Sequence, residues 1–355
     1  MFFERDGMLY FTRRGETVRI FAQGTDGLRV QATMLPAFGT CDWALEGASV
    51  RPAFCEIGEG EARIENGRMA ATVDRLGKIR LFADGKLVLE EYYRCYEYDM
   101  PHTPSLRIVA REFTPARGGD YALTLRFEAQ EEKLFGMGQY QQDTLDLKGC
   151  TLELAQRNSQ ASVPFLISSL GYGFLWNNPA VGRVTFAKNM TEWRAESCRQ
   201  LDYWVTAGDP KEALEHYTAL AGRAPEFPEN ALGLWQCKLR YRTQEEVLEV
   251  AREYHRRGIP LDVIVIDFFH WTRQGEWKFD KQYWPDPAAM VKELRSYGTR
   301  CMISVWPTVD KKSENFAEMR DRGLLIRPER GSQCFDFLGD SYIYDATNPE
   351  ARRYL

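Results

Sequence analysis

Apolar and polar residues alternate along much of the first 205 residues of the chain. The alternation is clear in residues 18–21, 28–31 and 123–127, and a period of two is typical of half-buried antiparallel strands. Asn66-Gly67 and Asp84-Gly85 lie between such runs and predict tight hairpin turns with positive φ. Many strands separated by turns predict a large β-sandwich.

The period of the pattern changes after the two prolines of residues 223–229. Just before them, Asp209-Pro210 predicts the start of a helix with Ala213, Leu214, Tyr217 and Leu220 on one face. We therefore predict two domains, a β-sandwich domain at residues 1–228 and a second domain at residues 229–355.

Strands and helices alternate in the second domain. Residues 232–237, 261–267 and 301–305 predict strands, and helices are expected to begin after Thr243, Asp286, Ser313 and Asn348. Thr243 and Glu246 form the pattern of a capping box. Successive strand–helix units require right-handed crossovers and a parallel sheet. Three strands of that sheet are present.

Asp267 follows the second of these strands directly. The run Val263–Ile266 has no alternation and predicts a strand buried on both faces. A carboxylate at its carboxyl end would lie at the edge of the sheet where α/β folds bind ligands. A carboxylate that only caps a local turn is the alternative, and the strand alone leaves both open.

Charge and composition exclude several classes of function. Lys and Arg total 46 against 51 Asp and Glu, a net charge of −5, so we expect no nucleic-acid partner. Eight cysteines without a CxxC pair argue against a zinc knuckle or a disulfide scaffold. We find no apolar run long enough for a membrane span and no export signal, so we expect no membrane partner and a cytoplasmic location.

No cofactor or metal is expected. No G-x-G-x-x-G follows the first predicted strand, which argues against a dinucleotide. Asp267, His270, Glu276 and Asp280 could ligate a metal by residue type, but their spacing matches no common metal motif. The segment at residues 135–141 contains two glycines, yet no Lys-Ser/Thr follows them, so a loop of the sandwich is expected there rather than a phosphate site.

Aromatic residues gather where the predicted strands end. Lys238–Tyr241 follows the first strand, Asp267–Trp271, with Phe268, follows the second, and Trp306 follows the third. The loop after the second strand adds four rings and two carboxylates: Trp277, Phe279, Tyr283, Trp284, Glu276 and Asp280. Flat rings stack on the C–H faces of sugars while charged groups bind the hydroxyls. The pattern favours a sugar site at this edge.

Five segments together resemble glycoside hydrolase family 31, the α-glucosidase and α-xylosidase group. They are FGMGQYQQDTLDLKG (135–149), PFLISSLGYGFLWNN (164–178), LGLWQCKLRYRTQEE (232–246), LDVIVIDFFHW with WPDP (261–271, 284–287), and ISVWP with YDATNPEA (303–307, 344–351). The resemblance implies a β-sandwich followed by a (β/α)8 TIM barrel, of which about three βα units are present. The first and third segments are most similar to the α-xylosidase branch.

The resemblance also implies roles for residues. Asp267 looks like the carboxylate that binds sugar hydroxyls in the −1 subsite, and Phe268, Trp271 and Trp306 look like parts of its wall. The family is a group of retaining enzymes whose two catalytic aspartates lie further along the barrel. The chain ends at Leu355 before that point, so we expect no catalytic residue in it, and Asp345 is predicted to serve only local structure.

Two functions remain in view. The first is an exo-acting retaining α-glycosidase acting on an oligosaccharide or small α-glycoside, with α-xyloside preferred to α-glucoside, of which this chain is an inactive portion. The second is a non-catalytic carbohydrate-binding or interaction module. The full-length protein could also form a homo-oligomer.

Overall fold

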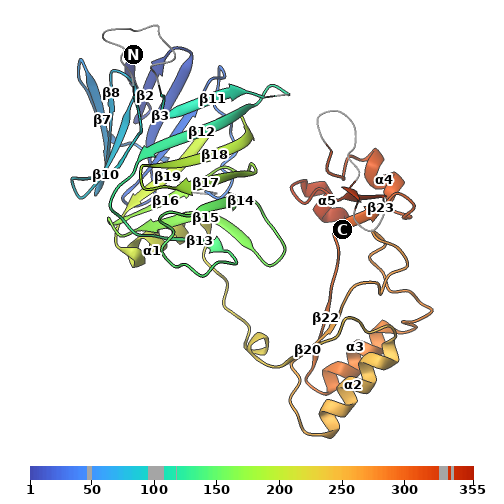
Figure 1. Ribbon diagram of the computed structural model, residues 1–355. Helices are drawn as coiled ribbons and strands as arrows, with labels where there is room; N and C mark the ends of the chain where they lie inside the picture. Colours follow the sequence, from blue (N-terminus) through green and yellow to red (C-terminus); the bar gives the residue numbers. More distant parts are fainter. Residues whose placement is uncertain (46–49, 95–107, 117, 328–334, 337–339) are drawn as a thin grey trace. The chain divides into compact units, whose positions relative to one another are not determined.

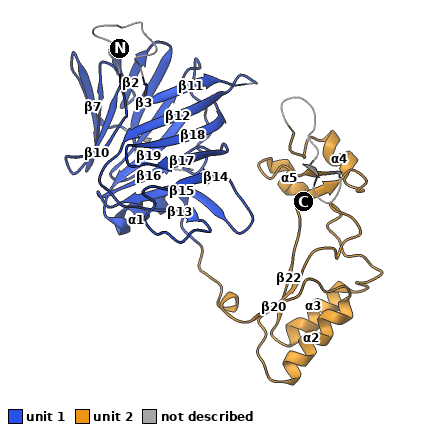
Figure 2. Cartoon of the chain, viewed as in Figure 1, with its two compact units in different colours: residues 1–224 blue, residues 225–355 orange. Residues whose placement is uncertain are grey.

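The computed structural model describes residues 1–45, 50–94, 108–116, 118–327, 335–336 and 340–355 (Figure 1). The chain divides into two compact units, Met1–Ala224 and Pro225–Leu355 (Figure 2). The predicted boundary after residue 228 lies in the same proline-containing segment. That each unit is an independently folding domain stays a prediction.

Three antiparallel sheets make up the first unit (Figure 1). The largest has the order β1-β2-β3-β4-β19-β16-β15-β13, with β5 paired to β3; its strands are β1 (Phe2–Arg5), β2 (Met8–Arg13), β3 (Glu16–Gln23), β4 (Gly27–Thr33), β5 (Val50–Arg51), β13 (Leu134–Gln139), β15 (Ala161–Ser168), β16 (Tyr172–Trp176) and β19 (Leu201–Ala207). The second has the order β10-β9-β8-β7-β6, with strands β6 (Phe54–Ile57), β7 (Glu61–Asn66), β8 (Met69–Asp74), β9 (Ile79–Ala83) and β10 (Lys86–Glu90). The third has the order β11-β12-β18-β17-β14, with strands β11 (Arg111–Pro115), β12 (Tyr121–Glu128), β14 (Thr151–Leu154), β17 (Gly182–Phe186) and β18 (Met190–Cys198). The predicted sandwich is confirmed.

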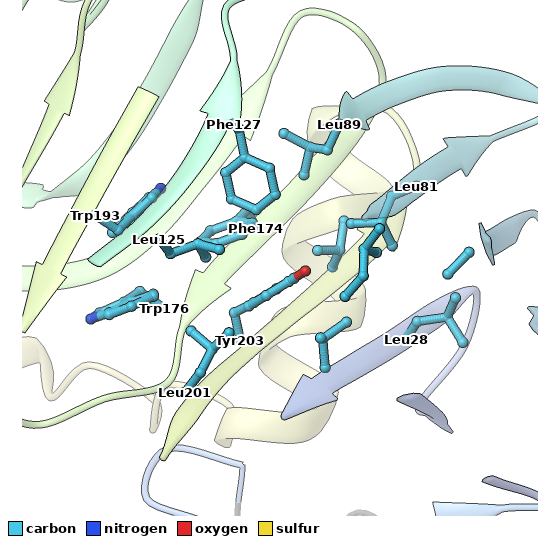
Figure 3. Packing of buried hydrophobic residues seen from close by; sticks show 14 of the residues in the cluster. Leu28, Leu81, Leu89, Leu125, Phe127, Phe174, Trp176, Trp193, Leu201 and Tyr203 are labelled. Atoms are coloured by element: carbon cyan, nitrogen blue, oxygen red, sulfur yellow. The ribbon is translucent and has the colours of Figure 1, made fainter. Parts of the chain in front are cut away.

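One hydrophobic core joins the three sheets (Figure 3). Phe174 of β16 stacks on Trp193 of β18 with ring centroids 4.9 Å apart and on Tyr203 of β19 at 5.2 Å, and Phe127 of β12 meets it edge-on at 5.9 Å. Alternate residues of each strand point into this layer, which is why the sequence shows a period of two.

The two predicted hairpin turns differ in detail. Asp84 and Gly85 have φ of 49° and 74° and join β9 to β10, as predicted for a two-residue turn. Asn66 is instead the last residue of β7, and the turn consists of Gly67, with φ of 58°, and Arg68. The prediction that both residues of Asn66-Gly67 form the turn was therefore wrong by one position.

The predicted glycine-rich loop at residues 135–141 is mostly strand β13. Its pairing with β15 shifts between Gly136 and Gly138, and residues 136, 137 and 138 all have positive φ. A Cβ at Gly138 would lie 2.1 Å from the carbonyl oxygen of Ala161. The glycines thus permit a bulged edge strand to approach its neighbour, which explains the composition that had suggested a loop.

Helix α1 (Pro210–Ala221) packs on the largest sheet. Asp209 caps it by accepting hydrogen bonds from the backbone N–H groups of Lys211 and Glu212, and Glu212 bonds back to the Asp209 N–H. Ala213 and Leu220 are buried. Leu214, predicted on the same face, is 48% exposed, so the buried stripe is narrower than the sequence indicated.

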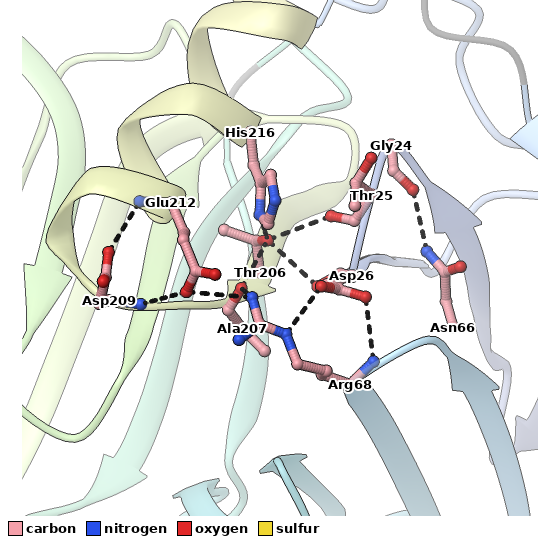
Figure 4. Close-up of polar contacts among 10 residues, drawn as sticks. All are labelled: Gly24, Thr25, Asp26, Asn66, Arg68, Thr206, Ala207, Asp209, Glu212 and His216. Atoms are coloured by element: carbon pink, nitrogen blue, oxygen red, sulfur yellow. Dashed lines mark hydrogen bonds and ion pairs between the residues drawn. The ribbon is translucent and has the colours of Figure 1, made fainter.

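Polar contacts also tie α1 to the sandwich (Figure 4). Arg68 pairs with Asp26 at 2.8 Å and with Glu212 of the helix at 3.1 Å. Thr206 of β19 and the Nδ1 atom of His216 lie 2.8 Å apart. These contacts attach α1 to the β-sandwich. The helix is followed by the exposed segment that joins the two units.

The second unit begins with a parallel sheet, as predicted. Its strands, in the order β20-β21-β22, are β20 (Trp235–Cys237), β21 (Val263–Ile266) and β22 (Arg300–Ile303), and they alternate with helices α2 (Gln244–Arg256) and α3 (Pro287–Ser296). The first strand is shorter than predicted because residues 229–232 form the 3-10 helix η2 (Glu229–Leu232).

The predicted capping box of α2 is only half formed. Thr243 accepts a hydrogen bond from the Glu246 N–H at 3.2 Å, but the Glu246 carboxylate accepts from the N–H of Arg242 instead. Thr243 is therefore a true N-cap, whereas the Glu246 side chain stabilises the loop that precedes the helix.

Among the described residues of this unit, helices α2 and α3 cover one face of the parallel sheet. Ile264 and Ile266 are fully buried in a core with Val247 and Leu294 of the helices. On the other face Trp235 and Met302 are 43% and 47% exposed. Between them, β21 itself has Val263, Ile264 and Ile266 buried and Val265 partly buried, so the prediction that this strand is buried on both faces is confirmed.

A small antiparallel sheet closes the second unit and was not predicted. Strands β23 (Thr308–Asp310), β24 (Phe335–Asp336) and β25 (Asp340–Ile343) pair in the order β23-β25-β24, with helices α4 (Phe316–Asp321) and α5 (Pro349–Tyr354) nearby in the chain. Val309, Met319 and Ala351 are at the centre of its own core. Within the described residues, no helix is both long and apolar enough to cross a membrane.

Candidate sugar site at the carboxyl edge of the parallel sheet

Asp267 lies at the carboxyl edge of the parallel sheet, immediately after β21. Strands β20, β21 and β22 all run in the same direction, so the residues that follow them share this edge. The side chain of Asp267 is partly exposed. Its position is the one where α/β folds place ligands.

The carboxylate of Asp267 is only partly used by the protein. Its Oδ1 atom accepts a hydrogen bond from the N–H of Phe268 at 2.8 Å. Among the described residues, no donor contacts Oδ2 and no Lys or Arg pairs with the carboxylate. The local turn that was the alternative interpretation is therefore present, and it leaves one oxygen available to a ligand.

Four aromatic rings gather beside Asp267. We call Phe268, Phe269, Trp271 and Trp306 the aromatic cluster. Trp306 lies 5.0 Å from Phe268, 5.5 Å from Phe269 and 5.8 Å from Trp271, measured between ring centroids. Residues from the ends of two different strands thus form one apolar wall.

The members of the aromatic cluster differ in exposure. Trp271 is 6% exposed and lies against Phe269 at 5.9 Å, so it supports the wall from behind. Phe269 is 38% exposed. It has φ of 64°, which is rare for a bulky residue.

Phe269 is a candidate site residue that sequence analysis missed. Two adjacent phenylalanines follow the strand, and the alternation of an extended chain would have put their rings on opposite sides. The left-handed backbone at Phe269 brings its ring next to Phe268, 4.7 Å away, instead. No signal in the sequence marks this conformation.

His270 is buried beneath the cluster. It is 4% exposed, and its Nδ1–H group donates a long hydrogen bond of 3.4 Å to the carbonyl of Asp267. Burial lowers the pKa of His270 below its usual 6.5. A neutral imidazole at this place stabilises the turn that carries Asp267.

Several aromatic residues expected at the rim lie elsewhere. Trp284 is 1% exposed and, with Phe279, packs in the core beneath the sheet. The indole N–H of Trp277 donates to the carbonyl of Trp306 at 2.9 Å, and its ring packs on the core of the C-terminal sheet. The prediction that these rings form the rim was therefore wrong, because the loop folds back onto two cores.

The carboxylates considered as metal ligands are engaged locally. Glu276 accepts hydrogen bonds from the Thr272 hydroxyl and the Glu314 N–H, and Asp280 accepts from the Gln282 N–H. In the described portion of the chain, no three His, Cys, Asp or Glu residues are placed to hold a metal ion. Asp345 accepts hydrogen bonds from the N–H and hydroxyl groups of Thr347, which stabilise its own turn.

The fold and the site together define a class of protein: an antiparallel β-sandwich followed by the first β/α units of a TIM barrel, with a carboxylate and aromatic rings at the carboxyl edge of the strands. Residues 224–355 match the model of the glycosyl hydrolases family 31 TIM-barrel domain. An uncharacterized family 31 glucosidase of Pseudescherichia vulneris is 48% identical over 96% of this chain and 67% of its own length. The chain belongs to glycoside hydrolase family 31, close to its α-xylosidases.

Other relatives agree with this assignment. Alpha-xylosidase A of Aspergillus niger is 36% identical over 68% of this chain and 34% of its own length. The crystal structure of a family 31 α-xylosidase from a soil metagenome, complexed with xylose, superposes with a TM-score of 0.92 at 48% identity and covers all of this chain. The chain spans 54% of that solved structure.

Proposed function

We propose that this chain is part of an exo-acting retaining α-glycosidase that releases a terminal α-linked xylose. The observation that carries the proposal is the carboxylate of Asp267, with one oxygen unpaired among the described residues, beside the exposed rings at the edge of the parallel sheet. The 48% identity to a structure that is complexed with xylose supports the same conclusion.

In this proposal Asp267 binds and does not react. A retaining glycosidase needs two carboxyl groups flanking the glycosidic bond, one as nucleophile and one as acid and base. Asp267 accepts hydrogen bonds from hydroxyls of the sugar in the −1 subsite. Phe268 and Trp306 contact the C–H face of that sugar. The resemblance assigns both catalytic aspartates to sequence beyond Leu355.

We favour xylose over glucose as the released sugar. Glucose carries one additional hydroxymethyl group, and a site can reject an added group by steric overlap. Phe268 and its neighbours Phe269 and Trp271 fill the space beside Asp267 with rings that contact each other. The proposed substrates are small α-xylosides or oligosaccharides, in a cytoplasmic protein that could be a homo-oligomer.

A non-catalytic carbohydrate-binding module is the second candidate. One observation favours it: Glu276, a carboxylate of the loop after Asp267, already accepts hydrogen bonds on both of its oxygens from Thr272 and Glu314. Such a module would bind a sugar without cleaving it.

The test uses the product of the complete gene, that is, residues 1–355 together with any sequence that follows in the reading frame. It is incubated with 4-nitrophenyl α-xyloside, and the first sugar released is analysed by proton NMR. Release of α-xylose supports the retaining glycosidase. Release of β-xylose contradicts the retaining mechanism, and xylose binding without release supports the module.

A further inference from the structure

Arg240 contacts the aromatic cluster from the loop that follows β20. Its guanidinium carbon lies 5.2 Å from the centroid of the Phe269 ring, and its Nη1–H group donates to the Phe269 carbonyl at 3.5 Å. Phe269 therefore contacts the guanidinium of Arg240 through both its ring and its backbone carbonyl. The Arg240 side chain is partly exposed at this edge.

Arg240 pairs with no carboxylate in the part of the chain that the structure describes. Arginines elsewhere in this unit do pair: Arg252 donates two hydrogen bonds to Glu293, and Arg322 pairs with Glu350. Most N–H donors of Arg240 thus remain open at the edge of the site. These donors are available to the acceptors of a ligand.

A series of contacts connects Asp267 to Arg240 through two phenylalanines. Asp267 adjoins Phe268, Phe268 contacts Phe269, and Phe269 contacts Arg240. Phe269 thus lies between the acidic and the basic group in this series of contacts.

We propose that Arg240 determines specificity by binding hydroxyl groups of a sugar in the leaving-group position. The inference rests on the proposed function and deepens it, because it identifies the leaving group as a second sugar. The exposed ring of Phe269 supplies an apolar surface for that sugar, and the guanidinium edge supplies donors for its hydroxyl oxygens.

A neutral sugar fits this edge better than an anionic leaving group. The carboxylate of Asp267, which no cation neutralises among the described residues, would repel an anion. A hydroxyl group can accept a hydrogen bond from Arg240 and donate one toward a carboxylate, so it satisfies both charges. The two unpaired groups of opposite sign therefore match a polyhydroxylated ligand.

The test compares two substrates in the complete gene product. One is 4-nitrophenyl α-xyloside, whose leaving group has no sugar hydroxyls, and the other is a disaccharide in which xylose is α-linked to glucose. Arg240→Met removes the donors and keeps an apolar side chain over Phe269. Arg242→Met, which removes an exposed cation of the same loop, is the matched control.

We expect Arg240→Met to lower kcat/KM for the disaccharide by about 10- to 100-fold, the range of a charged hydrogen bond. The loss on the aryl substrate should be a few-fold at most, and Arg240→Lys should recover part of the disaccharide activity. Hydrolysis of the aryl substrate by the wild type reports separately on the proposed function. If the wild type is active, equal losses of kcat/KM on both substrates, or no loss on either, would overturn the proposed role of Arg240. The proposed function would not be affected by that result.

Discussion

Arg29 and Asp202 form a buried, two-pronged ion pair although 173 positions separate them in the sequence. The Nε–H and Nη2–H groups of Arg29 donate to the two carboxylate oxygens of Asp202 at 2.8 and 2.6 Å. Both side chains are 2% exposed. The pair joins β4 to β19 in the middle of the largest sheet, where neighbouring strands come from opposite ends of the first unit.

Removing one partner of this pair should destabilise the sandwich strongly. Arg29→Met leaves the Asp202 carboxylate buried without its counter-charge, which costs about 3 to 5 kcal/mol of unfolding free energy. Hydrogen exchange of the β4 and β19 amides at increasing urea measures the change. Arg5→Met is the control, since Arg5 and Asp6 are 76% and 82% exposed and their pair should contribute nothing measurable. Equal protection in the two variants would contradict the prediction.

The second unit should lose stability in mild acid because of His270. Burial lowers its pKa below the usual 6.5, so the unfolded chain binds a proton more readily than the folded chain. The contribution of neutral His270 to the free energy of unfolding is complete above about pH 6.5. It decreases as the pH falls through the lowered pKa of the folded state. Amide exchange of β21 between pH 7.5 and 5 measures the slope after correction for intrinsic rates, and His270→Gln should flatten it. An unchanged slope in the variant would assign the effect to other groups.

Asp267→Ala in the complete gene product should lower the turnover of 4-nitrophenyl α-xyloside by orders of magnitude while the fold remains intact. A buried hydrogen-bonding group left without its partner costs about 1 to 3 kcal/mol, and more when one group is charged. Asp345→Ala is the matched control, because among the described residues that carboxylate accepts hydrogen bonds from Thr347 of its own turn. Kinetics and circular dichroism are measured for both. Equal activity of the two variants would leave Asp267 with a local structural role only.

The same enzyme should prefer aryl α-xyloside to aryl α-glucoside. The hydroxymethyl group of glucose would meet the rings beside Asp267, and Phe268→Ala should remove part of that obstruction. We expect the ratio of kcat/KM values for the two substrates to fall in the variant, mainly because glucoside activity rises. Equal rates on both substrates in the wild type would refute the preference.

The polypeptide of residues 1–355 by itself should show no glycosidase activity and should be digested from its C-terminal end. One face of the parallel sheet is uncovered, with Trp235 and Met302 exposed, and a three-stranded sheet cannot close a barrel. Residues 222–229 are all exposed, whereas the sandwich has a continuous core of its own.

Limited trypsin digestion followed by mass spectrometry tests this expectation. Cleavage after Arg223 should leave a resistant fragment of roughly 220 residues, since exposed segments with few buried contacts open most easily. Uniform resistance of residues 1–355, or hydrolysis of an aryl α-glycoside above a buffer control, would show that the chain completes its own fold and site.

The sequence by itself determined the two kinds of architecture. The first unit shows period-two alternation, and the second shows alternating strand and helix signals. Both patterns depend on local geometry, because the strand or helix period decides which residues of an element face the core. Asp267 was found in the same way, since a carboxylate directly after a continuous apolar strand can lie only at the edge of a sheet. Motifs spread along the chain carried the resemblance to the family.

Tertiary structure decided which side chains meet. The Arg29–Asp202 pair depends on the pairing of strands distant in sequence, which no local pattern encodes. Trp284 and Phe279 looked like rim residues until the loop was seen to fold onto the core. The run that contains Arg240 was expected at this edge, but its contact with Phe269, a residue with a left-handed backbone, was seen only in the folded chain. Such contacts depend on backbone conformation and on the packing of separate elements, so the order of residues alone does not fix them.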